Sequence, residues 1–226
     1  MHTELGLEGV ANGMPEPVVV TDAERADLLE VARTAVGVAS RALGSGALES
    51  VIHAVRGTDL RAAAFVTLTE AGELRGCMGV LDPERPVRDS VAEAAACATR
   101  ADPRFRPVTA DELSRIRIEV SVLGPMVPLA DPLAWRIGVD GIVVQLGARR
   151  GLLLPEVALE NGLDRIAMLD IATRKAGLSK DAWRHPEAIV SAFRTRRFGG
   201  PALAGHEPHH RSTSGGRSPT GRFRPR

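Results

Sequence analysis

The chain has 226 residues, of which 44% are hydrophobic and 25% are charged. The length predicts one domain, or a main domain with a small appendage. The composition is typical of a globular protein and excludes the collagen, coiled-coil and mucin-like classes. The 29 Lys and Arg and 28 Asp and Glu leave a net charge of +1, and the chain contains no tyrosine. We therefore do not expect nucleic-acid binding, because neither a basic field nor an aromatic stacking platform is present.

The sequence predicts a cytoplasmic protein without a membrane span. It has no apolar run long enough to cross a bilayer, and its first twenty residues contain three glutamates but no Lys or Arg, unlike a standard signal peptide. The two cysteines, Cys77 and Cys97, are too few for a disulfide framework and lack the spacing of a zinc site. Cys97 stands among alanines and is expected in the core. We predict no metal site.

Both ends of the chain differ in composition from its middle. Residues 1–20 contain three Gly and two Pro and are predicted to be a flexible N-terminus. In residues 199–226, Gly, Pro, Ser and Thr make up 15 of 28 positions, and five Arg stand against one Glu. We predict a disordered tail there. Its three histidines could bind a transition metal loosely, but a solvated extension is preferred because a metal site needs ligands in fixed geometry.

The first predicted elements are a helix and a β-hairpin. Thr21 and Glu24 have the spacing of a capping box, and apolar residues at helical spacing extend the helix to about residue 42. Residues 62–69 and 74–80 are predicted strands, joined by a turn at Ala71-Gly72.

Helices and another strand follow. A second long helix is predicted to begin at Pro86, and a second capping box, Thr109 with Glu112, precedes a short helix. Between residues 116 and 122, Ile and Val alternate with polar residues, which indicates a strand with one face on the core.

The second half of the predicted domain also combines strands with a helix. Strands are predicted at 141–146 and 150–154, a helix at 164–176 that stops at Gly177, and a closing strand at 188–198. Hairpins mixed with helices indicate an α+β fold with a largely antiparallel sheet.

A glycine-bracketed cysteine lies in the second predicted strand, in the run LRGCMG at residues 74–79. Strand alternation would put Arg75 and Cys77 on one face, where a guanidinium near the sulfur favours the reactive thiolate. Gly76 and Gly79 mark places where something approaches the backbone closely. In the alternative interpretation, Cys77 is a small buried hydrophobe and the glycines accommodate a neighbouring helix.

Other polar residues are candidates for a site. Arg104 could anchor a carboxylate or phosphate through two parallel hydrogen bonds, or it could pair with Asp102 and fix its loop. Glu119 could be a general base beside Cys77, or an ion-paired surface residue. His53 and His185 could pair with the cysteine, although core or surface roles are favoured. The common nucleotide-binding and hydrolase motifs are absent from the sequence.

The run LRGCMG resembles the LRGCIG hallmark of the AMMECR-one domain family. The resemblance covers about residues 25–198, and its further blocks occur in order: DPRF (102–105), EVSVL (119–123), GLLLPEVA (151–158) and KAGL (175–178). Met78 replaces the usual isoleucine. Thr173 stands where a cysteine is expected, which argues against a mechanism that needs two thiols.

The resemblance implies a domain over residues 21–198. Within it, a larger subdomain with an antiparallel sheet flanked by helices packs beside a smaller subdomain, with a cleft between them and LRGCMG near it. It implies no particular reaction or cofactor. Members are grouped with a Memo-like protein and a radical S-adenosylmethionine protein, which are therefore the expected partners in a pathway.

These observations lead to two hypotheses. In the first, the protein is a small-molecule enzyme in which Cys77 and Glu119 are catalytic and an anionic substrate is bound in the cleft. The predicted substrate-binding residues are Arg75, Gly76, Gly79 and Arg104. In the second, the protein is a non-enzymatic scaffold or regulatory protein that docks a partner at LRGCMG. A cavity shared by these groups would favour chemistry, whereas a buried sulfur without polar neighbours would favour a scaffold.

Overall fold

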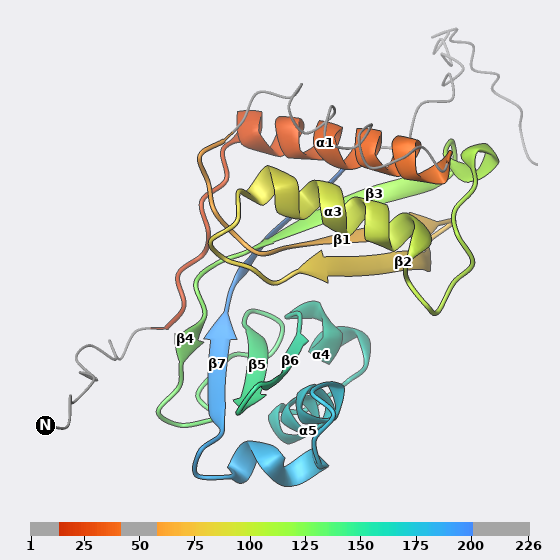
Figure 1. Ribbon diagram of the computed structural model, residues 1–226. Helices are drawn as coiled ribbons and strands as arrows, with labels where there is room; N and C mark the ends of the chain where they lie inside the picture. The colour runs from red at the N-terminus through yellow and green to blue at the C-terminus, as the bar shows by residue number, and fades with distance from the viewer. Residues whose placement is uncertain (1–13, 42–57, 201–226) are drawn as a thin grey trace, which may run out of the picture.

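The computed structural model describes residues 14–41 and 58–200, which form two lobes, each built on a four-stranded antiparallel sheet (Figure 1). The first sheet has the order β2-β1-β3-β8 and the second β4-β7-β5-β6. The strands of the first sheet are β1 (Ala64–Glu70), β2 (Glu73–Val80), β3 (Ile116–Leu123) and β8 (Thr195–Gly200). Those of the second are β4 (Val127–Pro128), β5 (Gly141–Leu146), β6 (Arg149–Leu153) and β7 (Ile189–Phe193). The predicted α+β class is confirmed.

Helices cover one face of the first sheet and flank the second. The first pair is α1 (Asp22–Ser40) and α3 (Val87–Arg100), and the second is α4 (Glu156–Glu160) and α5 (Arg165–Lys175). Short 3₁₀ helices are η1 (Ala110–Glu112) and η2 (Lys180–Arg184). Within the described ranges, no helix has both the length and the apolar character needed to cross a membrane.

Local signals place the helix ends where the sequence predicts them. Thr21 caps α1, and the side chain of Glu24 accepts a hydrogen bond from the Thr21 backbone at 2.8 Å, completing the capping box. Gly177, which follows α5, has a φ of 72°, a conformation that glycine adopts without steric cost. The hairpin turn at Ala71-Gly72 has positive φ at both residues, which suits the twist of a two-residue hairpin.

Two apolar clusters form the cores of the lobes, and a third joins them. The first lobe packs the inner residues of its sheet against α1 and α3. The second packs Trp135 and Trp183 with residues of β5 and α5. The joining cluster contains Ala63, which precedes β1, Leu123 of the first sheet, and Val143, Leu152 and Phe193 of the second sheet. The lobes are therefore held together by apolar burial over part of their interface.

The predicted closing strand at 188–198 is in fact two strands in different sheets. The chain leaves the second sheet at Arg194 and continues as β8 in the first. The carbonyl of Arg194 accepts a hydrogen bond from the Gly124 N–H at 2.8 Å, and its guanidinium lies 3.3 Å from the fully buried carboxylate of Asp140. These tertiary contacts fix the crossover, which has no local sequence signal.

The described part of the chain extends beyond the predicted domain at both ends. Residues 14–20 belong to no helix or strand, and Val20 is only 4% exposed. Gly199 and Gly200, which composition assigns to the tail, belong to β8. Residues 1–13 and 201–226, with the three tail histidines, lie outside the described residues.

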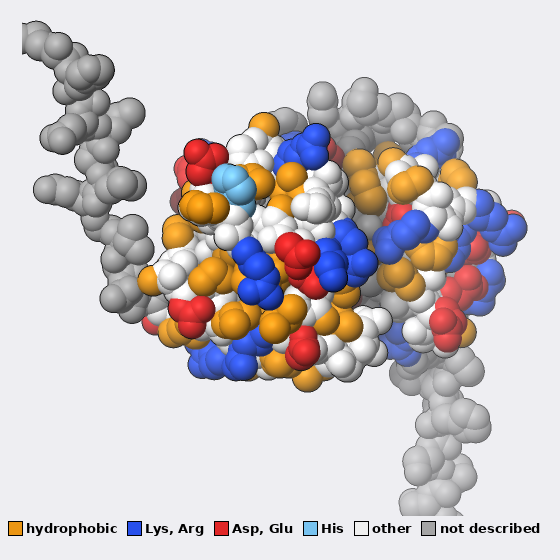
Figure 2. Space-filling model, turned by 90° about the horizontal axis from the view of Figure 1, so that it is seen from below, with side chains coloured by type: hydrophobic (Ala, Val, Ile, Leu, Met, Phe, Trp, Pro, Cys, Tyr) orange, Lys and Arg blue, Asp and Glu red, His pale blue; other side chains and the backbone are white. Residues whose placement is uncertain are grey.

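Acidic, basic and hydrophobic side chains are interspersed on the face of the second lobe seen from below (Figure 2). This pattern agrees with the near-neutral net charge of the chain. On the described part of this face, neither acidic nor basic side chains dominate.

Candidate functional site

A cavity of about 1260 Å³ lies in the cleft between the lobes. One wall comes from β1, β2, β3 and β8, and the other from β6, α4 and α5. The volume exceeds that of most small-ligand pockets, roughly 300–1,000 Å³. Of the predicted site residues, Cys77, Arg104 and Glu119 line this cavity.

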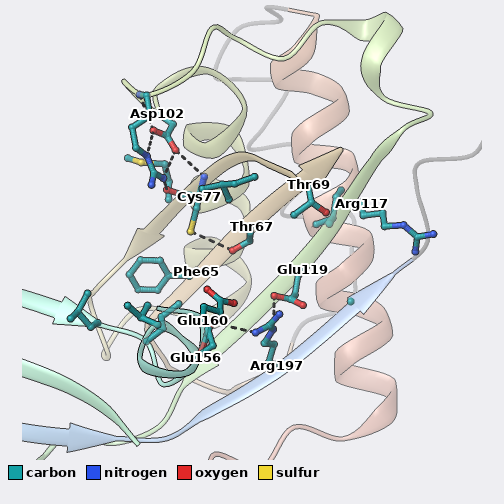
Figure 3. Close-up of a pocket in the computed structure, with 18 of the residues that line it drawn as sticks. Phe65, Thr67, Thr69, Cys77, Asp102, Arg117, Glu119, Glu156, Glu160 and Arg197 are labelled. Carbon is teal, nitrogen blue, oxygen red and sulfur yellow. Dashed lines mark hydrogen bonds and ion pairs between the residues drawn. The ribbon is translucent and has the colours of Figure 1, made fainter. Parts of the chain in front are cut away.

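Cys77 faces the cleft from the middle of β2. Its partner in the register is Thr67 of β1, and the Thr67 hydroxyl lies 3.3 Å from the sulfur, as a hydrogen-bond donor (Figure 3). Cys77 is half-buried and lines the cavity, so it is not a plain core residue. The structure thus gives the sulfur both a polar neighbour and open space.

The backbone of Cys77 is held by an ion pair from the loop after α3. Because β2 is an edge strand, the Cys77 N–H is free to donate to Oδ2 of Asp102, at 2.9 Å. The Cys77 carbonyl accepts a hydrogen bond from Nη2 of Arg104 at 3.3 Å. Together the two side chains take the place of a neighbouring strand and fix the residue that carries the thiol.

Asp102 and Arg104 are bound tightly to each other. Arg104 donates to the carboxylate through Nε at 3.0 Å and through Nη2 at 2.8 Å. These hydrogen bonds, helped by the backbone N–H groups of Cys77 and Arg104, lower the pKa of Asp102 to about 2 against the effect of burial. The Arg104 side chain remains 55% exposed, so the pairing with Asp102 leaves it accessible from the cavity.

Arg75 does not line the cavity, although alternation predicts that it faces the same way as Cys77. The register of β1 and β2 shifts after Leu68, which makes Arg75 an extra residue in the strand and breaks the alternation. Its guanidinium donates to Glu112 at 3.0 Å and to the carbonyls of Arg106 and Pro107 at 2.7 and 3.2 Å. Arg75 therefore anchors the loop that carries Asp102 and Arg104.

Glu112 connects Arg75 to the second capping box. Its carboxylate also accepts a hydrogen bond from the Thr109 N–H at 2.7 Å. Burial raises the pKa of Glu112, but the hydrogen bonds from Arg75 and Thr109 outweigh this and lower it to about 2. The buried carboxylate thus stays charged and holds the loop in place.

Gly76 and Gly79 serve close packing in the structure. A Cβ on Gly76 would lie 2.2 Å from the carbonyl oxygen of Ala98 in α3, and one on Gly79 would lie 2.5 Å from the ring of Phe65. Neither glycine is among the residues that line the cavity. The helix-accommodating interpretation fits Gly76, since any side chain would push β2 away from α3.

Glu119 lies in the same cavity as Cys77 but is bound in an ion pair. Its Oε1 is 2.5 Å from Nε of Arg197, and Nη1 of Arg197 is 3.5 Å from Glu156 (Figure 3). Burial raises the pKa of Glu156, and a backbone hydrogen bond and the charge of Arg197 oppose that effect. Glu119 therefore has the ion-paired role that the sequence left open as an alternative.

Lys175 is one of the cavity residues that reasoning from the sequence missed. It is the last residue of α5, it is exposed, and it lines the cavity from the lobe opposite β2. Partial desolvation lowers the pKa of its ammonium, and the charge of Arg104 lowers it further, against the opposing effect of Cys77. The sequence held two signals: the KAGL block begins with this residue, and the chain has only two lysines.

The one histidine among the described residues, His185, does not line the cavity. His185 is exposed, and its Nδ1 accepts a hydrogen bond from the Glu187 N–H at 3.1 Å. His53 lies outside the described residues. Across residues 14–41 and 58–200, no group of three or more His, Cys, Asp or Glu could hold a metal ion.

Two further positions singled out in the sequence have structural roles. Cys97 is half-buried in α3, where burial, and then the charge of Glu93, raises the pKa of its thiol. Thr173 is fully buried in α5, and its hydroxyl donates to the Leu169 carbonyl at 2.7 Å.

The AMMECR1 family model matches residues 29–198. The chain belongs to the AMMECR1 family. Relatives include a protein of Methanothermobacter thermautotrophicus, 46% identical over 144 residues, which are 61% of this chain and 75% of the relative. A protein of Aeropyrum pernix is 37% identical over 202 residues, covering 81% of this chain and 82% of the relative.

A crystal structure supports the fold of this AMMECR1 chain. The uncharacterised protein PH0010 of Pyrococcus horikoshii matches with a TM-score of 0.67 and 28% identity, covering 77% of this chain and 90% of that one. The family match contains the LRGCMG run and every residue of the cavity except Gly199. The resemblance drawn from the sequence blocks is thus confirmed.

Proposed function

We propose that this AMMECR1 protein is an enzyme that acts on a small anionic molecule in the cleft, with Cys77 as its nucleophile. The observation that carries the proposal is that Cys77, Arg104 and Lys175 line one cavity of about 1260 Å³. A thiol and two cations in one concave site suit covalent chemistry on a negatively charged substrate.

Each of these groups has a role in the proposed reaction. The Cys77 thiol first gives its proton to water in the open cavity, and the thiolate then forms a bond to an electrophilic carbon of the substrate. The displaced electron pair moves to the carbonyl oxygen or to the leaving group. Arg104 and Lys175 attract the anionic part of the substrate. Asp102 fixes the backbone beneath the nucleophile, which keeps the sulfur in a defined position. Glu119 accepts a proton only if its ion pair with Arg197 opens.

The burial of LRGCMG favours this proposal over docking of a partner at the same run. The side chain of Arg75 is 11% exposed and Gly76 is buried. Leu74, at the start of the run, is 41% exposed. A docking surface is expected to present several contiguous exposed residues, whereas this run presents its cysteine to a cavity.

Alkylation with two reagents that differ in charge tests the proposal. Iodoacetate is anionic and iodoacetamide is neutral, and peptide mapping by mass spectrometry reads Cys77 and Cys97 separately in one chain. We expect Cys77 to prefer iodoacetate, relative to Cys97, because Arg104 and Lys175 attract the anion. Lys175→Gln should reduce this preference several-fold, and Lys180→Gln, on η2 outside the cavity lining, is the matched control.

Two results would contradict the proposal. One is a Cys77 that reacts no faster than Cys97 with either reagent. The other is a preference for iodoacetate that is the same in the Lys175→Gln and Lys180→Gln proteins.

A further inference from the structure

We propose that Lys175 captures carbonyl compounds as an imine, and that its ligand is an aldehyde or ketone carrying an anionic group. The inference rests on the proposed function, since it uses the same cavity, and it narrows the substrate class from an anionic molecule to an anionic carbonyl compound.

The placement of Lys175 is the first support. It reaches the cavity from α5 of the second lobe, whereas Cys77 and Arg104 reach it from the first lobe. A molecule between the lobes would meet an amine on one side and a guanidinium on the other. Beside Lys175, the wall of the second lobe is formed by the leucines at 152–154 and by Glu156, Val157 and Glu160 of α4.

The charge state of Lys175 is the second support. Only the neutral amine attacks a carbonyl, and partial desolvation lowers the pKa of Lys175. The charge of Cys77 opposes this shift, and the charge of Arg104 adds to it. More of Lys175 is therefore uncharged near neutral pH than of an ordinary surface lysine. Arg104 has two effects: it disfavours the ammonium form of Lys175 and attracts the anionic group of the ligand.

The step is balanced without an added oxidant or reductant. The nitrogen lone pair of Lys175 forms a bond to the carbonyl carbon, and a proton passes from nitrogen to the carbonyl oxygen. Loss of water then leaves a carbon–nitrogen double bond. The same carbon is electrophilic toward the Cys77 sulfur, which explains why an amine and a thiol share one cavity.

Reductive trapping tests the inference on the full chain. Glyoxylate, an anionic aldehyde, is added with sodium cyanoborohydride, which reduces an imine to a stable secondary amine. Peptide mapping then compares Lys175 with Lys180, the two lysines of the chain. We expect several-fold more adduct on Lys175 than on Lys180, and a smaller ratio with acetaldehyde, which carries no charge. Lys180→Gln should leave trapping at Lys175 intact.

The Cys77→Ser protein separates this inference from the proposed function. If the Cys77→Ser protein still shows trapping at Lys175, and Cys77 of the wild type does not react with haloacetates, the imine site is supported and the thiol enzyme is not. Equal adduct on Lys175 and Lys180 would overturn the inference, whatever Cys77 does. So would a ratio that is the same for glyoxylate and acetaldehyde, because Arg104 would then play no part.

Discussion

The two faces of the first sheet differ although the same strands build them. On the helix face, the inward side chains of β1 and β3 are at most 1% exposed and pack against α1 and α3. They are Val66, Leu68, Ile118 and Val120. On the other face, the alternate residues of β1 and β3 are largely polar and line the cavity: Phe65, Thr67, Thr69, Arg117 and Glu119. The alternation of the strands therefore separates a packed core from a candidate site.

The difference lies in what covers each face. Two long helices seal the helix face, while the second lobe touches the other face through the joining cluster and leaves a cavity beside it. Stability should thus depend mainly on the helix face, and reactivity on the cleft face. Substitutions on the two faces test whether stability and reactivity separate in this way.

The largest difference in stability is expected between substitutions of two neighbouring residues of β1 that lie on opposite faces of the sheet. Leu68→Ala should lower the free energy of unfolding by about 3 kcal/mol, because it leaves a cavity beneath the helices. Thr67→Val, on the cleft face, keeps the shape of the side chain and should cost less than about 1 kcal/mol. Urea unfolding measures both, and equal losses would show that the two faces contribute alike.

The two glycines of LRGCMG make a second pair. Gly76→Ala should destabilise by about 2 kcal/mol or more, since its Cβ would meet the backbone of α3. Gly79→Ala should cost less, because the ring of Phe65 is a side chain that can move. A thermal unfolding series gives the order, and a reversed order would contradict the packing of β2 on α3.

Acid should weaken the contact that holds Cys77. The pKa of Asp102 is lowered to about 2 from 3.8, so its contribution is complete above about pH 4 and is lost as the pH falls through about 2. The shift corresponds to about 2 kcal/mol at neutral pH. Asp102→Asn should therefore be less stable than the wild type at pH 7, and the gap should narrow toward pH 2. A difference in unfolding free energy between the two proteins that does not change with pH would contradict the ion pair.

The smallest predicted change concerns reactivity alone. Thr67→Val removes the hydroxyl that lies 3.3 Å from the sulfur. We expect the alkylation rate of Cys77 to fall by a few-fold, because a hydrogen bond donated to the sulfur favours the thiolate. The rate of Cys97 should stay constant, because α3 lies on the other face of the sheet. A parallel change at both cysteines would indicate general loosening of the fold.

Sequence reasoning succeeds where the signal is local. The capping box at Thr21, the hairpin turn at Ala71-Gly72 and the helix stop at Gly177 each depend on a few adjacent residues. The resemblance to a family adds the cleft and the placement of Cys77 in it, which composition and spacing alone leave open.

Sequence reasoning fails where contacts between distant parts of the chain determine the structure. One extra residue in β2 turns Arg75 away from Cys77, and the crossover at Arg194 depends on Gly124 and Asp140. Lys175 joins the cavity only because α5 of one lobe faces β2 of the other. None of these relations has a fixed spacing along the chain.

The most direct test of a cleft-facing thiol compares the two cysteines in the folded, full chain. Native alkylation with iodoacetamide, followed over time by peptide mapping, gives a rate for each. The structure predicts that Cys77, open to the cavity, is modified before Cys97, whose thiol pKa is raised by burial. Modification of Cys97 first, or of neither until denaturant is added, would contradict the account.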